Sequence, residues 1–181
     1  MIHKKYTGIL LIICLLFSLF VFSSCGQQET QQTPEEEPSA TQEDINARVE
    51  SKLDAYKTDL LDSAESMESN ADIREYLLHW AKTKSIEAEA DAHGNVIMKV
   101  KCSKGYEAAD PTVILCPYDV QQYKTLATPI ALSLYIVKNY EKTGVLNVVF
   151  SPQKQNRFTG VKKLSSDLFS DDTNVFLLTA A

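Results

Sequence analysis

Apolar residues recur at steps of three and four positions between residues 43 and 66. The stripe has six members: Ile45, Val49, Leu53, Tyr56, Leu60 and Ala64. Because an α-helix makes one turn every 3.6 residues, this spacing places all six side chains on one face. The pattern predicts an amphipathic helix over residues 43–66 that packs against a core along one side.

Three further segments are typical of helices. Residues 69–72, Ser-Asn-Ala-Asp, can cap a second helix that carries apolar side chains at positions 73, 76, 77 and 80. Pro129 suits the first turn of a third helix running to about Glu141, because the first N–H groups of a helix need no intrahelical partner. Residues 161–168 are expected to form a short fourth helix.

Short apolar runs between these helices predict strands. The expected strands are residues 86–90, 95–102, 112–116, 145–150 and 175–178. The run at 112–116 is unbroken and flanked by Pro111 and Pro117, which is typical of a strand buried on both faces. Helices alternating with apolar strands predict one α/β domain over residues 43–181, with a largely parallel sheet and an antiparallel portion early on.

The N-terminus has the three parts of a secretion signal. Lys4 and Lys5 are followed by the apolar run 9–22 and then by small residues before Cys25. The run has 14 residues, whereas a membrane-spanning helix needs about 20. The ending Phe-Ser-Ser-Cys resembles a lipobox, in which the cysteine thiol takes a diacylglyceryl group; the alternative is an ordinary signal peptide with an incidental cysteine.

We therefore predict a signal peptide at residues 1–24 and a lipid on Cys25, which holds the protein on the extracytoplasmic face of the cell membrane. Residues 25–42 have no aromatic and no branched apolar side chain. Such a segment cannot bury enough surface to offset its ordering entropy, so we expect a disordered tether.

The mature chain is acidic. Removing residues 1–24 takes away two lysines and leaves 16 basic against 24 acidic residues, a net charge of −8. Because the sequence has no basic stripe, nucleic acid is not an expected partner.

Two cysteines, Cys102 and Cys116, belong to the predicted domain. If strands 95–102 and 112–116 pair antiparallel, about four residues of strand, or about 13 Å, separate the two sulfurs. That distance is too long for a disulfide, so we predict two free, mostly buried thiols.

Several phrases, in order, resemble the zinc-dependent dipeptidases and aminopeptidases of the aminoacyl-histidine dipeptidase (peptidase D) type. The resemblance runs from about residue 45 to 181 and covers roughly the first third of a family member. The segments that carry it are 73–82, 86–97, 105–107, 111–115, 125–126 and 158–164. The resemblance implies part of a three-layer α/β/α zinc-peptidase-like domain with a mixed, mostly parallel sheet.

The family holds two zinc ions at the carboxyl ends of its strands, where a glutamate deprotonates a bridging water. The resemblance places its metal and base positions on residues of other types. These positions are Tyr118, Val120, Pro129, Lys154, Gln155 and Ala180. A slip by one residue brings in Asp119 but puts Pro117 at the histidine, so no register restores the pair. The resemblance therefore implies no catalytic residue and no metal ligand at these positions.

Other candidates have plainer interpretations. His79 lies on a helix face and His93 in a turn, and Cys116 ends a buried apolar strand, where a thiol is usually inert. Four basic residues could line a cleft for an anion but are more typical of a solvated face. They are Lys154, Arg157, Lys162 and Lys163.

The leading hypothesis is a membrane-tethered lipoprotein whose peptidase-like domain is catalytically degenerate, without a cofactor, and has a binding or structural role. The alternative is a zinc-dependent dipeptidase or aminopeptidase that is misaligned, truncated, or completed by a partner chain. The sequence identifies neither a peptide or small-molecule ligand nor the oligomeric state. A chain shortened from a longer gene would be expected to leave an exposed sheet edge.

Overall fold

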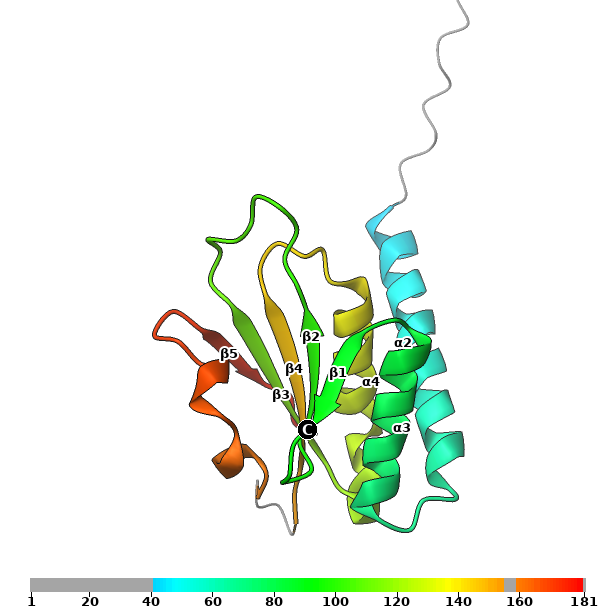
Figure 1. Cartoon of the computed structure of the whole chain (residues 1–181). Coiled ribbons are helices and arrows are strands. Elements are labelled where there is room, and N and C mark those ends of the chain that lie inside the picture. The colour runs from blue at the N-terminus through cyan, green and yellow to red at the C-terminus, as the bar shows by residue number, and fades with distance from the viewer. Residues whose placement is uncertain (1–40, 155–158, 181) are drawn as a thin grey trace, which may run out of the picture. The chain divides into compact units, whose positions relative to one another are not determined.

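The computed structural model describes residues 41–154 and 159–180, within the compact unit Ala40–Ala181. The predicted signal peptide, Cys25 and the tether up to residue 40 lie outside the described residues. Five strands form one mixed sheet in the order β1-β2-β4-β3-β5, with α-helices packed beside it (Figure 1). The strands are β1 (Glu87–Ala90), β2 (Val96–Val100), β3 (Thr112–Tyr118), β4 (Leu146–Pro152) and β5 (Asn174–Leu177).

The first two helices in the described part of the chain begin at hydrogen-bonded caps. In α2 (Gln42–Ala64), Oδ2 of Asp44 accepts a hydrogen bond from Thr41 N at 3.1 Å, and Oγ1 of Thr41 accepts one from Asp44 N at 3.2 Å. In α3 (Asn70–Thr83), Oδ2 of Asp72 accepts from Ser69 N at 2.8 Å. These bonds satisfy N–H groups that have no partner inside a helix. Both helices lie where the apolar stripes predicted them.

The helix α4 (Tyr123–Asn139) starts earlier than the sequence predicted. Pro129 lies inside α4 and is buried, so its assignment to the first helical turn was wrong. The 3₁₀ turn η1 (Val120–Gln122) runs directly into α4, and burial of Leu126 and Ala127 draws the first turns into the core. This burial outweighs the one backbone hydrogen bond that a proline removes.

The sheet combines parallel and antiparallel pairs, as expected. β3 pairs in parallel with β4 and β5, whereas β2 is antiparallel to both β1 and β4. The assumed pairing of β2 with β3 was wrong, because β4 lies between them and is buried along most of its length. The two predicted free thiols are confirmed: Cys116 is buried and Cys102, which follows β2, is half-buried.

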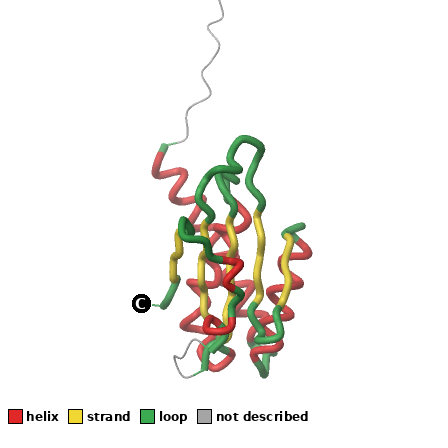
Figure 2. Tube along the Cα trace, turned by 60° about the vertical axis from the view of Figure 1, so that its left-hand side comes forward, coloured by secondary structure: helices red, strands yellow, loops and turns green. Residues whose placement is uncertain are grey.

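The main core lies between the helices and one face of the sheet. All three described α-helices contribute buried residues to it, including Leu60, Leu77 and Leu134. The rings of Tyr56 and Trp80 pack edge to face, with their centroids 5.7 Å apart. Figure 2 shows the strands side by side with helices behind them. Burial of this face supplies the hydrophobic stabilisation of the fold.

The second face has a thinner cover. Ile97, Val113 and Val149 form a small buried cluster, covered by Leu164 and Leu168 from the segment 161–168. This segment is not the single short helix predicted, because it consists of two 3₁₀ turns, η2 (Val161–Lys163) and η3 (Ser166–Leu168). Ser165 interrupts it: the residue is extended, and its side chain accepts a hydrogen bond from Asp167 N.

The outer strand β5 is exposed. Val175, Phe176 and Leu177 keep 50%, 56% and 51% of their surface accessible, although they pair through the backbone with β3. Such an apolar edge can pair with another strand. Within residues 41–154 and 159–180, none of the helices has the length and apolar character needed to cross a membrane.

Candidate functional site

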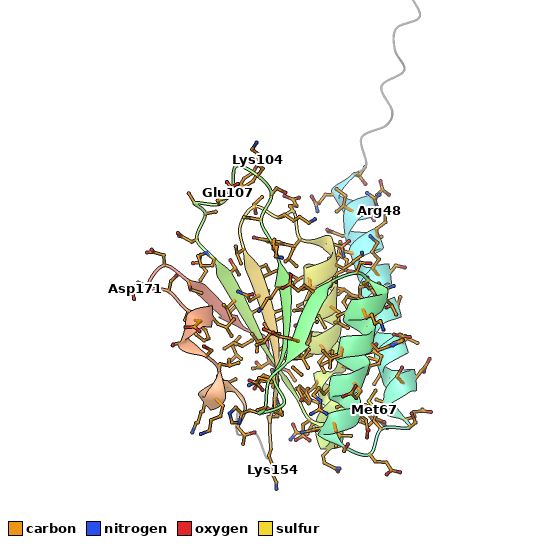
Figure 3. The ribbon with its side chains drawn as sticks, in the orientation of Figure 1. Arg48, Met67, Lys104, Glu107, Lys154 and Asp171 are labelled. Carbon is orange, nitrogen blue, oxygen red and sulfur yellow. The ribbon has the colours of Figure 1, made fainter. Side chains whose placement is uncertain are left out.

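The carboxyl ends of the three parallel strands meet at one edge of the sheet. In folds of this kind, that edge is where ligands usually bind. Tyr118 ends β3 and Pro152 ends β4, and Lys154, just beyond β4, lies at the same end of the molecule in Figure 3. Side chains at this end are therefore the first candidates for chemistry.

Tyr118 closes the end of β3 against another part of the chain. Its side chain is 1% exposed, and its hydroxyl donates a hydrogen bond to the carbonyl oxygen of Gly94 at 2.6 Å. Burial raises the pKa of the Tyr118 phenol to about 12; Arg74 opposes the rise and Asp91 adds to it. The phenol is thus protonated at neutral pH and acts as a donor that joins β3 to the β1–β2 turn.

The β1–β2 turn is itself held by a polar network. Oδ1 of Asp91 accepts hydrogen bonds from the backbone N–H groups of His93 and Asn95, at 2.8 and 2.9 Å. Nδ2 of the buried Asn95 donates to Oδ2 of Asp91 at 2.6 Å and to the carbonyl oxygen of Gly160 at 3.2 Å. This network fixes the chain after β4 onto the turn, and His93 is a turn residue, as its position suggested.

Gly160 allows a very close approach in this network. A Cβ atom there would lie 2.7 Å from Cδ of Pro152 and would also overlap Oδ1 of Asn95 and Oγ of Ser151. Those two oxygen atoms are buried and have no hydrogen-bond partner among the described residues. Buried polar atoms of this kind are costly, so the close packing at this end has an energetic penalty.

The next two residues after β3 also have structural partners. Oδ1 of Asp119, which is 7% exposed, accepts a hydrogen bond from Gln121 N at 3.0 Å and caps η1. The N–H group of Val120 donates to Oδ1 of Asn70 at 2.7 Å. Asp119, the carboxylate nearest to the position the resemblance assigns to an aspartate, therefore serves as a helix cap.

Four of the positions that the resemblance assigns to metal ligands or a base remain. Pro129 from α4 and Ala180 from the segment after β5 line the same groove of about 480 Å³, together with Leu132 and Leu178. Lys154 is exposed just beyond β4. Gln155 lies outside the described residues. The structure therefore brings Pro129 and Ala180 together, in mainly apolar surroundings.

We found no group of three or more His, Cys, Asp or Glu side chains placed to hold a metal ion in the described parts of the chain. His79 is exposed on α3. Burial raises the pKa of the Cys116 thiol to about 12, with a smaller opposing effect from Ser133. A thiol with that pKa is protonated at neutral pH, so Cys116 lacks the thiolate that nucleophilic catalysis requires.

The residues that close this end were not identified from the sequence. Asn95 and Gly160 are 65 positions apart, and neither has a spacing that indicates contact. A glycine soon after the short polar run 153–157 was the one signal available, because close approach of two backbones often requires glycine.

The fold is similar to that of known peptidases. A crystal structure of a tripeptidase from Staphylococcus aureus subsp. aureus Mu50 superimposes with a TM-score of 0.54 and 12% identity, over 73% of this chain and 44% of that chain. Aminoacylhistidine dipeptidase from Vibrio alginolyticus gives a TM-score of 0.47 and 18% identity, over 58% of this chain and 28% of that chain. No protein-family model and no curated protein sequence matches the chain.

These comparisons define the class of fold. The chain has a peptidase-like α/β domain with a mixed five-stranded sheet, as the resemblance implied. It spans less than half the length of the tripeptidase it matches. At this level of identity the likeness concerns the fold alone, so chemistry must be argued from the residues at the strand ends.

Proposed function

We propose that this chain is a membrane-tethered lipoprotein whose peptidase-like domain binds a ligand or partner and does not cleave peptides. The hydrogen bond from the Tyr118 hydroxyl to Gly94 O carries this proposal. Tyr118 stands where the resemblance expects a zinc-binding histidine. A protonated phenol committed to a backbone carbonyl is a structural tie, because zinc in proteins is bound by thiolate, imidazole and carboxylate groups.

The other assigned positions support the same proposal. Pro129 and Ala180 have no side-chain donor for a metal ion, and Val120 offers only its backbone N–H, which bonds to Asn70. Lys154 places an ammonium group where the resemblance expects a catalytic base. A cation there opposes binding of two dications by Coulomb repulsion. The groove beside Pro129 and Ala180 is the place at this end where a peptide or small molecule would fit.

Activity measurements with zinc test the proposal directly. The purified full chain, incubated with zinc and a panel of dipeptides and tripeptides, is expected to release no amino acids above the rate without protein. Zinc-dependent hydrolysis that stops on chelation would instead support the alternative, a zinc-dependent dipeptidase or aminopeptidase. In that event an Asp119→Asn variant is the control, since loss of the activity would assign it to this chain and not to a contaminant.

The membrane tether is tested separately. Lys4, Lys5, the apolar run 9–22 and the small residues before Cys25 support lipid attachment at the Cys25 thiol. Bacteria that express the chain and grow with an alkyne-tagged fatty acid should label the wild type and the matched Cys102→Ser variant. Cys25→Ser should carry no label. Equal labelling of Cys25→Ser would refute the assignment of the lipid to Cys25.

A further inference from the structure

A second pocket lies at the other end of the sheet from Tyr118. It has a volume of about 300 Å³ and is formed by the end of α3, the start of β1, the end of β2 and the end of α4. Five lysines line this pocket, which we call the lysine pocket: Lys84, Lys99, Lys101, Lys138 and Lys142. Such a concentration of positive charge stands out in a chain whose net charge is −6.

Carboxylates neutralise only part of this charge. Nζ of Lys99 lies 2.6 Å from Oε1 of Glu89, and Nζ of Lys101 lies 3.0 Å from Oε2 of Glu87. Three lysines, Lys84, Lys138 and Lys142, have no ion pair within the described residues. Nζ of Lys138 donates to the backbone carbonyl oxygen of Lys84 at 3.3 Å, which holds the Lys138 side chain beside the end of α3.

Lysines near helix ends often offset the negative end of the helix dipole, which is about half a unit charge. That role accounts for Lys84 after α3 and Lys138 in the last turn of α4. Glu89 and Glu87 pair with Lys99 and Lys101, so Lys142, in the turn before β4, is left without a carboxylate partner or a helix end among the described residues. The lysine pocket therefore has more positive charge than the two helix ends require.

The backbone of the lysine pocket is also unusual. Ser85 (φ 57°) and Lys142 (φ 60°) are the two non-glycine residues with positive φ in the described chain, and both line this pocket. Ser85 follows α3 at a position where glycine is common: its N–H donates to Lys82 O, and Ile86 N donates to Ala81 O. Strained backbone of this kind is often found at functional sites.

We propose that the lysine pocket binds a phosphate group. Lysine ammonium groups bind phosphate as point charges, and an anion placed among Lys84, Lys138 and Lys142 would meet three positive groups that lack a carboxylate partner. The pocket volume is at the lower end of the range for small-molecule sites, so a phosphate with a small organic group fits better than a large ligand.

The phosphate could come from a soluble phosphoester or from a phospholipid headgroup. Figure 3 places Arg48 of α2 at the same end of the molecule as Lys104, and Lys154 at the other end. The chain thus enters α2 from the end that holds the lysine pocket, and the proposed lipid on Cys25 precedes it. The headgroup source rests on the proposed tether, whereas the soluble source does not.

Titration calorimetry on the full chain, in a detergent without phosphate, tests the proposal with two probes. Inorganic phosphate represents the soluble source, and glycerophosphoglycerol, a deacylated phospholipid headgroup, represents the lipid source. The pocket variant combines Lys84→Gln, Lys138→Gln and Lys142→Gln. A matched control combines Lys154→Gln, Lys162→Gln and Lys163→Gln, three exposed lysines outside the pocket, so both variants have the same net charge.

We expect saturable binding of at least one probe to the wild type. The pocket variant should bind it about tenfold more weakly or worse, because three attractive charges are removed, and the control should stay within about twofold of the wild type. The tighter probe identifies the source of the phosphate. Absence of binding by both probes, or equal losses in the two variants, would overturn the proposal.

Nuclear magnetic resonance on the wild type keeps the test decisive if the pocket variant does not fold. Addition of the bound probe should shift the amide signals of Ser85 and Lys142 more than those of Gly94 and Gly160 at the opposite end of the sheet. Shifts confined to the opposite end would contradict the proposal. This result does not depend on the activity test, so the peptidase-like domain could prove active without changing it.

Discussion

The two ends of the sheet differ in how their polar side chains are placed. At the carboxyl ends of β3 and β4, buried polar side chains donate hydrogen bonds to backbone carbonyl oxygens, as Tyr118 does to Gly94 and Asn95 does to Gly160. At the other end, the lysine pocket exposes ammonium groups, of which Lys84, Lys138 and Lys142 have no carboxylate partner among the described residues. We call the first the closed end, because buried hydrogen bonds hold it together, and the second the open end, because its ammonium groups are exposed.

This difference shows that a protein can keep a fold without keeping the functional site that the fold usually has. A peptidase-like sheet normally directs chemistry to the carboxyl ends of its strands, where loops can present ligands. In this chain the same positions support packing and capping, as Asp119 and Tyr118 do. Unpaired positive charge instead collects at the opposite end of the sheet, where this fold does not usually have a functional site.

The largest expected effect comes from Gly160→Ala, at the closed end. The new Cβ would lie 2.7 Å from Cδ of Pro152 and overlap the buried oxygens of Asn95 and Ser151. Because buried backbone and side chains cannot move aside freely, the free energy of unfolding should fall by about 3 kcal/mol. Urea unfolding followed by circular dichroism measures this change.

The matched control is Gly144→Ala, in the turn before β4. A Cβ atom at Gly144 would meet the carbonyl oxygen of Asp110 and the hydroxyl of Tyr140 at 3.4 Å, and Gly144 does not have a positive φ. Its effect should stay within about 1 kcal/mol. Equal losses in the two variants would show that the closed end is packed no more tightly than the other.

The next effect depends on pH and tests how well the closed end excludes water. Burial raises the pKa of the Cys116 thiol from 9.0 to about 12. The folded state therefore holds this proton more tightly than the unfolded state, so the contribution to stability is complete below pH 9 and is lost as the pH rises toward 12. By pH 10.5 the thiol alone should lower the free energy of unfolding by about 2 kcal/mol.

Cys116→Ala isolates this contribution from other alkaline titrations. The variant is expected to lose some stability at pH 7, because a buried sulfur is removed, but to lose less than the wild type between pH 8 and pH 10.5. If Cys116→Ala and the wild type have parallel pH profiles, the thiol is not buried as the structure indicates.

The sequence predicted the helices and strands better than it predicted which strands lie side by side. The stripe from Ile45 to Ala64 and the apolar run at 112–116 identified α2 and β3, because local periodicity reports which side of an element is buried. Which strand lies beside β2 depends on the crossover through α4, and local periodicity does not contain that information. Pro129 misled because a proline tolerated inside a helix and one at its start look the same in sequence.

The candidate sites were predicted unevenly for a similar reason. The resemblance located Tyr118 at the end of a strand and Val120 just after it, where the structure also has them, but it placed Pro129 at a helix start, whereas Pro129 lies inside α4. It contained no information on the lysine pocket, whose members come from several elements and from positions 84 to 142. Runs of charge near one another in sequence, such as Lys162 and Lys163, drew attention instead, although no described pocket gathers them.

A smaller effect is expected from Tyr118→Phe, which removes one hydroxyl and keeps the ring. The carbonyl oxygen of Gly94 would lose its bond to that hydroxyl, and the free energy of unfolding should fall by about 1.5 kcal/mol. Tyr140→Phe is the control at the lysine pocket, where the hydroxyl has no hydrogen bond within the described residues, so it should change stability by less than about 0.5 kcal/mol. Chemical denaturation of both variants measures the contrast. Equal effects would mean that the Tyr118 bond does not close its end of the sheet.

The smallest effect concerns Ser85, and its sign is opposite to the others. Because glycine adopts a positive φ without the clash of a Cβ atom, Ser85→Gly should raise the free energy of unfolding by about 0.5–1 kcal/mol. Ser85→Ala, which keeps a Cβ atom at the same φ of 57°, should bring no such gain. Thermal denaturation compares the two variants, and phosphate titration of the same samples adds the functional measurement.

A gain in stability accompanied by weaker phosphate binding would show that the serine is kept at an unfavourable backbone conformation for the ligand. A gain in stability with unchanged binding would assign the strain to the helix end alone. If Ser85→Gly is no more stable than Ser85→Ala, the backbone at the open end is not strained, and the contrast between the two ends rests on charge and packing.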